Sequence, residues 1–246
     1  HRQGVNHQEP RRSCGFVPWL RFLEQNPAMQ KTMFFIALWG CAGVAFSAEP
    51  AVVPVACTQR ELPSPSESGV LAEVNRARQS PRQYADTIKR IFASMDGAGI
   101  YARGSRRVST MEGRAAVDDA LRFLASVEPA RPLRMASCLN LAAARHAKAK
   151  GSTGSHGHFG VTGTDPSRRA SFLTTSPVAC SENIAYGYDT ATEMVAALIV
   201  DDGVPSRGHR ANLFDPRMKS FGSGRSAHLL RKTIDVQLFC LDDIRS

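Results

Sequence analysis

The hydrophobic period of this chain changes from helical spacing to strand alternation toward the C-terminus. Apolar residues recur every three or four positions in five segments, which predicts helices near residues 70–77, 84–92, 117–127, 137–150 and 190–199. In residues 232–240, apolar side chains alternate with Asp235, Gln237 and Phe239, which predicts a strand with one buried face. Helices followed by a small antiparallel sheet indicate the α+β class or a three-layer sandwich.

Short polar patterns predict where some of these helices begin and end. Ser109-Thr-Met-Glu112 and Thr190-Ala-Thr-Glu193 both have capping-box spacing, so each predicts a helix N-terminus. By this interpretation Glu193 is a cap rather than a catalyst. Gly151 predicts the C-terminal stop of the Ala-rich helix before it.

Two segments without helical periodicity predict loops. Residues 95–107 contain Gly and Arg, and residues 151–187 are rich in Gly, Ser, Thr and His. Loops on a rigid scaffold are where functional sites tend to lie. Residues 218–225 predict the hairpin partner of the C-terminal strand, weakened by Gly222 and Gly224.

Residues 29–48 have the order of a secretory signal peptide, with one lysine, an apolar run and then small residues. The apolar run is shorter than the ~20 residues that a spanning helix needs, which argues against a stable membrane anchor. We therefore expect a secreted or periplasmic protein. We expect residues 1–28 to be a mis-annotated or non-native leader, residues 49–67 an extended leader, and residues 68–246 one folded domain.

Four cysteines follow the predicted signal peptide: Cys57, Cys138, Cys180 and Cys240. Their even number in an exported chain predicts two disulfides, for which three pairings are possible. We expect Cys138 to pair with Cys180, and Cys57 to pair with Cys240. No C-x-x-C pair occurs, so the spacing does not resemble a zinc ribbon.

The chain is mildly basic. Residues 1–48 hold five basic and two acidic residues, so the net charge of the remainder is +6 instead of +9. Lys and Arg are scattered, and no basic run is interleaved with aromatic residues as in a nucleic-acid platform. The sequence therefore predicts a solvated basic face and no nucleic-acid partner.

Four residues near predicted turns combine imidazoles with carboxylates: His158, Glu182, Asp201 and His209. Two neutral imidazoles and a carboxylate can bind a divalent cation such as zinc, and the same set without metal can be a buried hydrogen-bond network. Taken singly, each has a plainer interpretation as a loop or turn residue, and His156 competes with His158. Carboxylates are unfavourable at a helix C-terminus, which indicates another role for Asp201.

The motifs around these residues resemble the bacterial branch of the CAP superfamily, the cysteine-rich secretory and sperm-coating-protein-like domains. They are Ser-Glu182-Asn-Ile-Ala-Tyr-Gly and Asp-Asp-Gly-Val-Pro-Ser-Arg-Gly-His209-Arg-Ala-Asn-Leu-Phe, preceded by Ala-Ala-Arg-His-Ala and Gly-His158. The resemblance covers residues 68–240. It implies an exported, disulfide-bonded α-β-α sandwich with two histidines and two acids in a central cleft that sometimes holds a divalent cation.

The matching positions are His158 and His209 for the histidines, and Glu182 and Asp201 for the acids. Asp201 is matched by its place at the end of the preceding helix. The sequence departs from the family at Ser181, where glycine is usual, and in a loose version of the Asp-Gly-Ser loop after the first histidine.

No nucleophile elbow, H-E-x-x-H, P-loop or dinucleotide fingerprint occurs, so no enzyme class is indicated. This favours a monomeric, secreted binding module for a small molecule, a lipid or a cell-surface component. The alternative is a divalent-metal-dependent hydrolase, in which His158 and His209 hold the cation and Glu182 or Asp201 acts as general base. A structural or adhesive surface protein is a third hypothesis, because a fold alone does not settle function.

Overall fold

The computed structural model of the protein describes residues 65–244. The predicted leader over 1–28, the predicted signal peptide over 29–48 and all but the end of the extended leader lie outside the described residues. Residues 65–67 are helical, so the extended leader predicted over 49–67 does not reach residue 67. Within the described range, we find no helix with the length and apolar character to cross a membrane.

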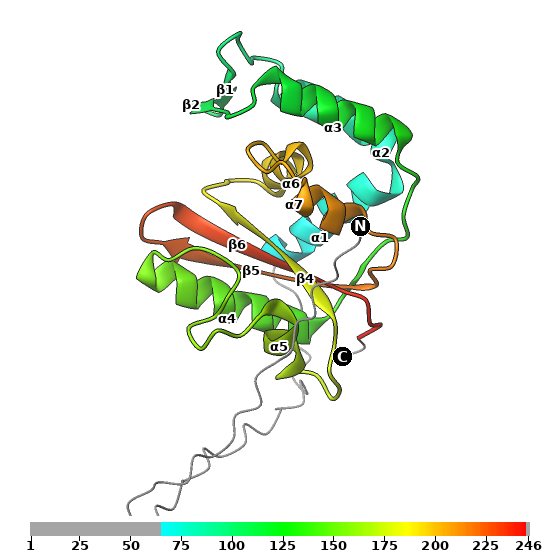
Figure 1. Cartoon of the computed structure of the whole chain (residues 1–246), viewed down its shortest axis with the longest axis vertical. Helices are drawn as coiled ribbons and strands as arrows, with labels where there is room; N and C mark the ends of the chain where they lie inside the picture. Colours follow the sequence, from blue (N-terminus) through cyan, green and yellow to red (C-terminus); the bar gives the residue numbers. More distant parts are fainter. Residues whose placement is uncertain (1–64, 245–246) are drawn as a thin grey trace, which may run out of the picture. The chain divides into compact units, whose positions relative to one another are not determined.

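A four-stranded sheet lies between two layers of helices, so the α+β, three-layer α-β-α sandwich is confirmed (Figure 1). The spatial order is β3 (Arg134–Met135), β5 (Ser220–His228), β6 (Lys232–Cys240) and β4 (Cys180–Tyr186). The pairs β5–β6 and β4–β6 are antiparallel, whereas the short β3 runs parallel to β5. Strand β4 is therefore an edge of the sheet.

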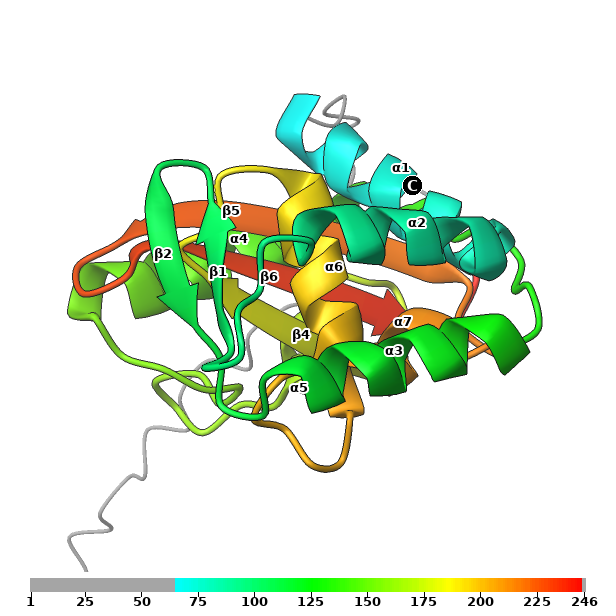
Figure 2. The same cartoon turned by 90° about the horizontal axis from the view of Figure 1, so that it is seen from above.

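Among residues 65–244, five helices lie on one side of the sheet and two on the other. The larger layer contains α1 (Pro65–Gln79), α2 (Pro81–Ile91), α3 (Arg114–Ser126), α6 (Ala191–Val200) and α7 (Gly208–Phe214). The opposite layer contains α4 (Ser137–Thr153) and α5 (Pro166–Ser171). The hairpin of β1 (Ile100–Arg103) and β2 (Arg106–Ser109) lies beside the larger layer (Figure 2).

Of the two helix N-termini predicted from capping-box spacing, one is confirmed, with a Thr190 side-chain cap. Thr190 Oγ1 accepts a hydrogen bond from the backbone N–H of Glu193 at 3.2 Å and caps α6. The box predicted at Ser109 is wrong, because α3 begins at Arg114 after Gly113. Glu112 instead accepts a hydrogen bond from the backbone N–H of Gly203 at 2.8 Å, across 91 residues.

Strand β6 is buried on both faces, not on one as predicted. Ile234, Val236 and Leu238 pack against α4. On the other face Asp235 and Gln237 are only 5% and 1% exposed. The alternation along β6 therefore does not separate a buried face from a solvent-exposed face. The apolar residues face α4, and the polar residues face α1 and α6, which cover them.

Glycine lets α4 approach the sheet closely. A Cβ added to Gly222 or Gly224 would lie 2.2–2.3 Å from α4 backbone atoms. Gly151 lies inside α4, where a Cβ would lie 2.0 Å from the carbonyl oxygen of Ala227. The prediction that Gly151 ends the helix is wrong, since Gly154, at φ 68°, is the C-cap.

Two of the segments predicted as loops contain strands. Residues 95–107 include β1 and the start of β2, and residues 151–187 include β4. Strand β4 lacks an alternating pattern because Glu182 through Ala185 are all buried. Unlike in β6, polar and apolar residues do not alternate along β4, so β4 carries no period-2 signal that would identify it.

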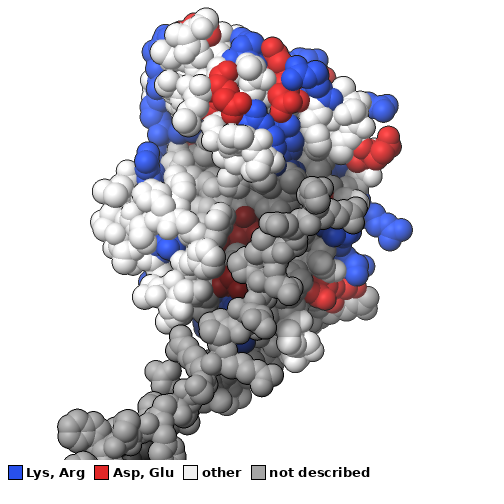
Figure 3. Space-filling view, in the orientation of Figure 1, with Lys and Arg blue, Asp and Glu red and all other residues white. Residues whose placement is uncertain are grey.

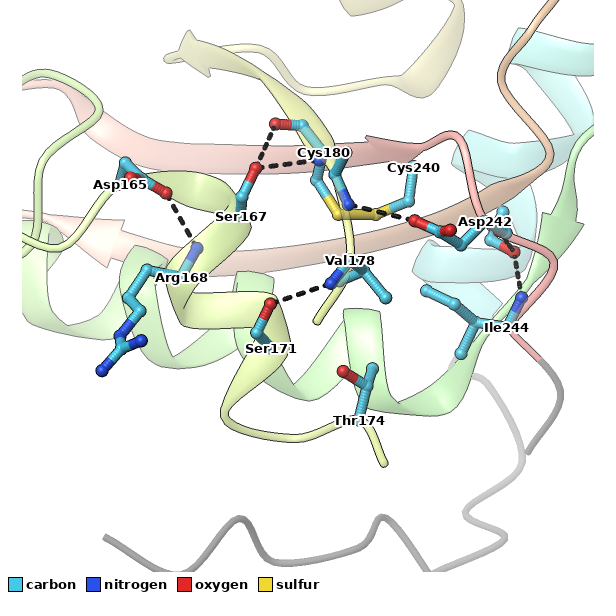
Figure 4. Close-up of a disulfide and its surroundings, with 12 residues drawn as sticks. Asp165, Ser167, Arg168, Ser171, Thr174, Val178, Cys180, Cys240, Asp242 and Ile244 are labelled. Atoms are coloured by element: carbon cyan, nitrogen blue, oxygen red, sulfur yellow. Dashed lines mark hydrogen bonds between the residues drawn. A yellow bond between two sulfur atoms is a disulfide. The ribbon is translucent and has the colours of Figure 1, made fainter. Parts of the chain in front are cut away.

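A disulfide joins Cys180 on β4 to Cys240 on β6, which lie opposite each other in the sheet register. The expected pairs of Cys138 with Cys180 and of Cys57 with Cys240 are therefore wrong. Cys138 is disulfide-bonded as well, and Cys57 lies outside the described residues. Figure 4 shows that Ser167 of α5 is hydrogen-bonded to the backbone of Cys180. Its hydroxyl accepts from the Cys180 N–H at 2.9 Å and donates to the Cys180 carbonyl oxygen at 3.2 Å.

Candidate functional site

Asp201 and His209 form a hydrogen-bonded pair at the turn between α6 and α7. The carboxylate contacts His209 Nδ1 at 2.6 Å and accepts hydrogen bonds from the backbone N–H groups of His209 at 2.9 Å and Arg210 at 3.3 Å. Asp201 therefore lies at the C-terminus of α6, but its carboxylate accepts hydrogen bonds from free N–H groups at the N-terminus of α7. Negative charge is favourable at that end of a helix. This explains a carboxylate that is unfavourable for its own helix.

The Asp201–His209 pair sets the hydrogen bonding of the imidazole. A carboxylate only accepts hydrogen bonds, so the tautomer that matches this contact has its hydrogen on Nδ1 of His209 and leaves Nε2 as an acceptor. The Asp201 side chain is 2% exposed and that of His209 is 23% exposed. Asp201 is thus buried and orients the ring of His209, while part of the imidazole is exposed to solvent.

Glu182 of β4 and His158 form the second acid–histidine pair. Its buried carboxylate contacts His158 Nδ1 at 3.0 Å and Arg169 Nη2 at 2.5 Å. Arg169 also donates to the carbonyl oxygens of His158 and Thr164, at 2.6 and 2.7 Å. Arg169 therefore attaches the loop that carries His158 to the edge of the sheet.

A third histidine approaches Glu182 from α4. His146 Nε2 lies 3.8 Å from Glu182 Oε1 and 3.2 Å from the carbonyl oxygen of Gly157. Burial lowers the pKa of His146, although the charge of Glu182 opposes this shift. His146 lies in the quoted Ala-Ala-Arg-His-Ala string, but the sequence did not indicate that it faces Glu182.

The structure distinguishes His158 from the competing His156. The His156 ring packs against Tyr186 and His228, with ring centroids 5.0 and 5.2 Å apart. Only His158 of these two neighbours forms a contact with Glu182 among the described residues. The geometry therefore places His158 opposite the acid, as the motif resemblance implied.

The two pairs lie on two sides of edge strand β4. Adjacent strand residues point to opposite faces, so Glu182 faces the layer of α4 and α5 while Asn183 faces α7. Asn183 Nδ2 donates to the carbonyl oxygen of His209 at 3.1 Å, and Asn212 Nδ2 donates to Asn183 Oδ1 at 2.9 Å. The amide network of Asn183 and Asn212 thus connects two pairs that do not contact each other directly among the described residues.

A cavity of about 290 Å³ adjoins the Asp201–His209 pair. Tyr101 of the β1–β2 hairpin, Ile184 of β4 and Leu198 of α6 contribute apolar or aromatic walls. Neither Glu182 nor His158 lines the cavity. Of the four residues predicted from the sequence, the cavity therefore contains one acid and one imidazole.

Two arginines that flank His209 hold the turn in place, and the sequence did not indicate their partners. Arg207 forms two contacts of 2.6 Å with Glu112 and lies 3.3 Å from Asp119. Arg210 donates to the carbonyl oxygen of Ile199 at 2.5 Å and contacts Asp119 at 2.8 Å. These bonds join the site turn to α3 and the segment before it.

The Arg207–Glu112 pair gives a titration prediction. Hydrogen bonds from Arg207, and then from the Gly203 N–H, lower the pKa of Glu112 from 4.5 to about 2. Because the folded-state pKa is lowered, the contribution of Glu112 to stability is present above about pH 4.5 and is lost as the pH falls toward 2. We expect Arg207→Gln to raise the Glu112 pKa toward 4.5, but not all the way because the Gly203 N–H bond remains, in a side-chain carboxyl NMR titration.

Arg122→Gln is the matched control for this titration. Arg122 is an exposed residue of α3 that lies 3.5 Å from Asp119. The control should leave the Glu112 titration at its low value. A Glu112 pKa near 4.5 in the unsubstituted protein would contradict the ion pair.

The donor set does not fit a catalytic zinc site. Such sites use three protein ligands, whereas the two imidazoles here belong to separate clusters, His158 with Glu182 and His209 with Asp201. Across residues 65–244, no group of three or more His, Cys, Asp or Glu side chains is arranged to hold a metal ion. No step of the function proposed below therefore runs through a metal.

On the face shown in Figure 3, Lys and Arg side chains are interspersed with Asp and Glu. Several surface charges of the described residues are paired, including Arg106 with Asp189 and Arg107 with Asp96. The basic residues on this face do not form a continuous patch.

The sequence matches one protein-family profile, and parts of the chain are similar to solved structures. Residues 71–228 match the sequence profile of the cysteine-rich secretory protein family, CAP. Among solved structures, an outer surface protein from Borrelia burgdorferi is 23% identical, with a TM-score of 0.39, over 45% of this chain and 78% of that chain. No curated protein matches the sequence.

Two further solved structures are similar over smaller parts of their own length. An extracellular protein with an SCP domain from Bacillus anthracis is 18% identical, with a TM-score of 0.37, over 45% of this chain and 34% of that chain. A cysteine-rich secretory protein from Staphylococcus aureus is 12% identical, with a TM-score of 0.33, over 63% of this chain and 48% of that chain.

Proposed function

Since the chain belongs to the cysteine-rich secretory protein (CAP) family, we propose that it is an exported binding protein whose ligand occupies the cavity beside His209. The observation that carries this proposal is a cavity that has both aromatic or aliphatic walls and polar lining residues, among them one carboxylate-supported imidazole. Ligand pockets typically pair apolar walls with a few placed polar groups that orient the ligand.

The cavity limits the size of the ligand. Its volume of about 290 Å³ is roughly ten times the ~30 Å³ that one water occupies in the liquid. It therefore takes a small molecule, or one end of a longer lipid or cell-surface component. Asp201 and Asp202 also line the cavity, so an uncharged polar group suits it better than an anion.

His209 supplies the polar contact in this proposal. With Nδ1 donating to Asp201, Nε2 accepts a hydrogen bond from a ligand hydroxyl or amide. The aromatic and aliphatic walls bind the apolar part of the ligand. The His158–Glu182–Arg169 cluster acts separately, by holding the loop on the far side of β4.

The proposal is tested with 1-octanol and octanoate, which have the same carbon chain and different polar ends. We expect octanol to bind the purified protein, and octanoate to bind at least tenfold more weakly because it meets two carboxylates. His209→Ala should weaken octanol binding by about tenfold, the value of one hydrogen bond of about 1.4 kcal/mol. Binding is measured by NMR titration of the backbone amides of β4 and α6.

Gln83→Ala, on an exposed position of α2, is the control and should bind octanol like the parent. Equal binding of octanol by the parent and by His209→Ala would contradict the proposed site. One equivalent of zinc per chain, lost in both His158→Ala and His209→Ala, would instead establish the metal-dependent site of the alternative hypothesis. Stoichiometric metal analysis of the purified protein measures that outcome.

Export is part of the same proposal. Family membership and the Cys180–Cys240 disulfide support an oxidising compartment, in which such bonds persist. This proposal includes the signal peptide predicted over residues 29–48. It also includes a location that is either secreted or periplasmic.

A further inference from the structure

Most of the exposed large apolar side chains in residues 65–244 lie on α4 and on the two segments beside its C-terminal end. These five are Leu141 of α4, Phe159 and Val161 of the loop after α4, and Leu229 and Leu230 of the β5–β6 turn. The sixth, Met111, precedes α3. A single exposed apolar residue is ordinary, but several on neighbouring segments indicate an interaction surface.

The β5–β6 turn and the loop after α4 contact each other at the end of α4. The backbone N–H of Leu229 donates to the carbonyl oxygen of Gly151 at 3.2 Å. His228 Nε2 contacts the carbonyl oxygen of Ser155 at 3.2 Å, where the loop begins. We refer to the four most exposed apolar residues of this turn and loop as the apolar tip: Phe159, Val161, Leu229 and Leu230, which are 64% to 90% exposed.

The segments that carry the apolar tip are basic and contain no acid. Residues 136–164 and 226–234 have no Asp or Glu, and their basic residues are Arg145, Lys148, Lys150, Arg231 and Lys232. Lys232 is paired with Asp189, whereas Arg231 has no acidic partner in the described part of the chain. In Figure 3, the surface over the β5–β6 turn is mostly uncharged. An anionic surface therefore complements the tip.

We propose that the apolar tip docks the protein on the surface of a membrane that contains anionic phospholipids. Leu229 and Leu230 lie at the boundary between headgroups and acyl chains, and Arg231 contacts lipid phosphates. Burial removes exposed apolar surface from water, and basic residues are attracted to the negative potential of the membrane surface. Peripheral binding depends on both contributions. This docking does not depend on the function proposed for the cavity at His209.

The test is sedimentation of the purified protein with lipid vesicles of two compositions. One set is phosphatidylcholine alone, and the other contains about 30% phosphatidylglycerol, which supplies the anionic headgroups. We expect the protein to bind the anionic vesicles at least tenfold more tightly than the neutral ones. Equal binding to both compositions, or no binding to either, would overturn the proposal.

Replacing both Leu229 and Leu230 with serine tests the apolar contribution. Both side chains are exposed, so the double variant should fold, which circular dichroism checks. We expect it to bind anionic vesicles at least tenfold more weakly than the parent. Met111→Ser is the matched control, because Met111 is 84% exposed and lies outside the tip, and it should bind like the parent. Parent-like binding by the leucine variant would overturn the proposal.

Arg231→Gln tests the charge contribution. We expect about fivefold weaker binding, which corresponds to about 1 kcal/mol for one basic residue at an anionic membrane. Lys219→Gln is the control, because Lys219 is exposed at the opposite end of the nine-residue strand β5, about 30 Å from the turn. Equal losses in the two variants would assign the attraction to overall charge and would overturn docking through the tip.

A tryptophan placed in the tip reports the depth of docking directly. Residues 65–244 contain no tryptophan. The added fluorescence of Leu230→Trp, relative to the parent, should shift to shorter wavelength with anionic vesicles, whereas that of Met111→Trp should not. Equal shifts would overturn the proposal. A dimer that forms without vesicles, and that the leucine double variant loses in analytical ultracentrifugation, would instead assign the tip to a second copy of the chain.

Discussion

Replacing both Cys180 and Cys240 with serine is expected to lower the free energy of unfolding by about 4 kcal/mol. The bridge joins residues 60 apart in the sequence, and a cross-link of that span removes a large part of the conformational entropy of the unfolded chain. It also closes edge strand β4 onto β6, next to the strand segment that carries Glu182. Urea denaturation followed by circular dichroism measures the loss.

The alanine double variant at the same two positions is the control for this measurement. Cys240 is fully buried, so serine also buries a hydroxyl, whereas alanine does not. Similar losses in the two double variants would assign the effect to the missing cross-link. A serine variant with unchanged stability would contradict the structural role of the bridge.

Gly222→Ala and Gly224→Ala are each expected to destabilise the protein by about 3 kcal/mol, because overpacking a close backbone contact forces the elements apart. At Gly222 the new methyl group would lie 2.3 Å from Leu139 Cβ, and at Gly224 it would lie 2.2 Å from the Ala144 backbone nitrogen. These neighbours belong to α4 and cannot rotate away as a flexible side chain would. The change is measured from thermal and urea unfolding.

Gly97→Ala is the matched control, because no atom lies within 4 Å of the position that its Cβ would take. We expect its free energy of unfolding to stay within about 0.5 kcal/mol of the parent value. If Gly222→Ala were equally well tolerated, α4 would not be as close to β5 as described. A hydrogen bond of 2.9 Å from the Ser223 N–H to Asn140 Oδ1 supports the close contact independently.

Local patterns in the sequence predicted most of the helices and two strands, since residues 218–225, predicted as the hairpin partner, correspond to β5. The periodicities over 70–77, 84–92 and 117–127 fall within or beside α1, α2 and α3. The range predicted for the C-terminal strand, 232–240, is the range of β6. These predictions succeeded because hydrophobic periodicity is local and reflects which side of an element is covered.

The candidate residues were found through motifs, and their partners were found only in the structure. The sequence identified His158, Glu182, Asp201 and His209, and the structure arranges them as two pairs on two sides of β4. Arg169 was missed as the clamp on Glu182, because nothing in a single sequence signals a contact 13 residues away across a loop. The register that places Cys180 opposite Cys240 was also missed, since β4 was predicted as a loop.

The sequence by itself determined most of the helices, the last two strands, the family motifs and the residue types that can support an imidazole. The tertiary structure alone decided which residues meet: Cys180 with Cys240, Glu112 with Arg207, and Ser223 with Gln237 in the register of β5 and β6. The physical reason is the separation along the chain of the residues that interact. Periodicity and capping depend on neighbours within a few residues, whereas strand register, ion pairs and cavities depend on packing between segments that lie far apart in the chain.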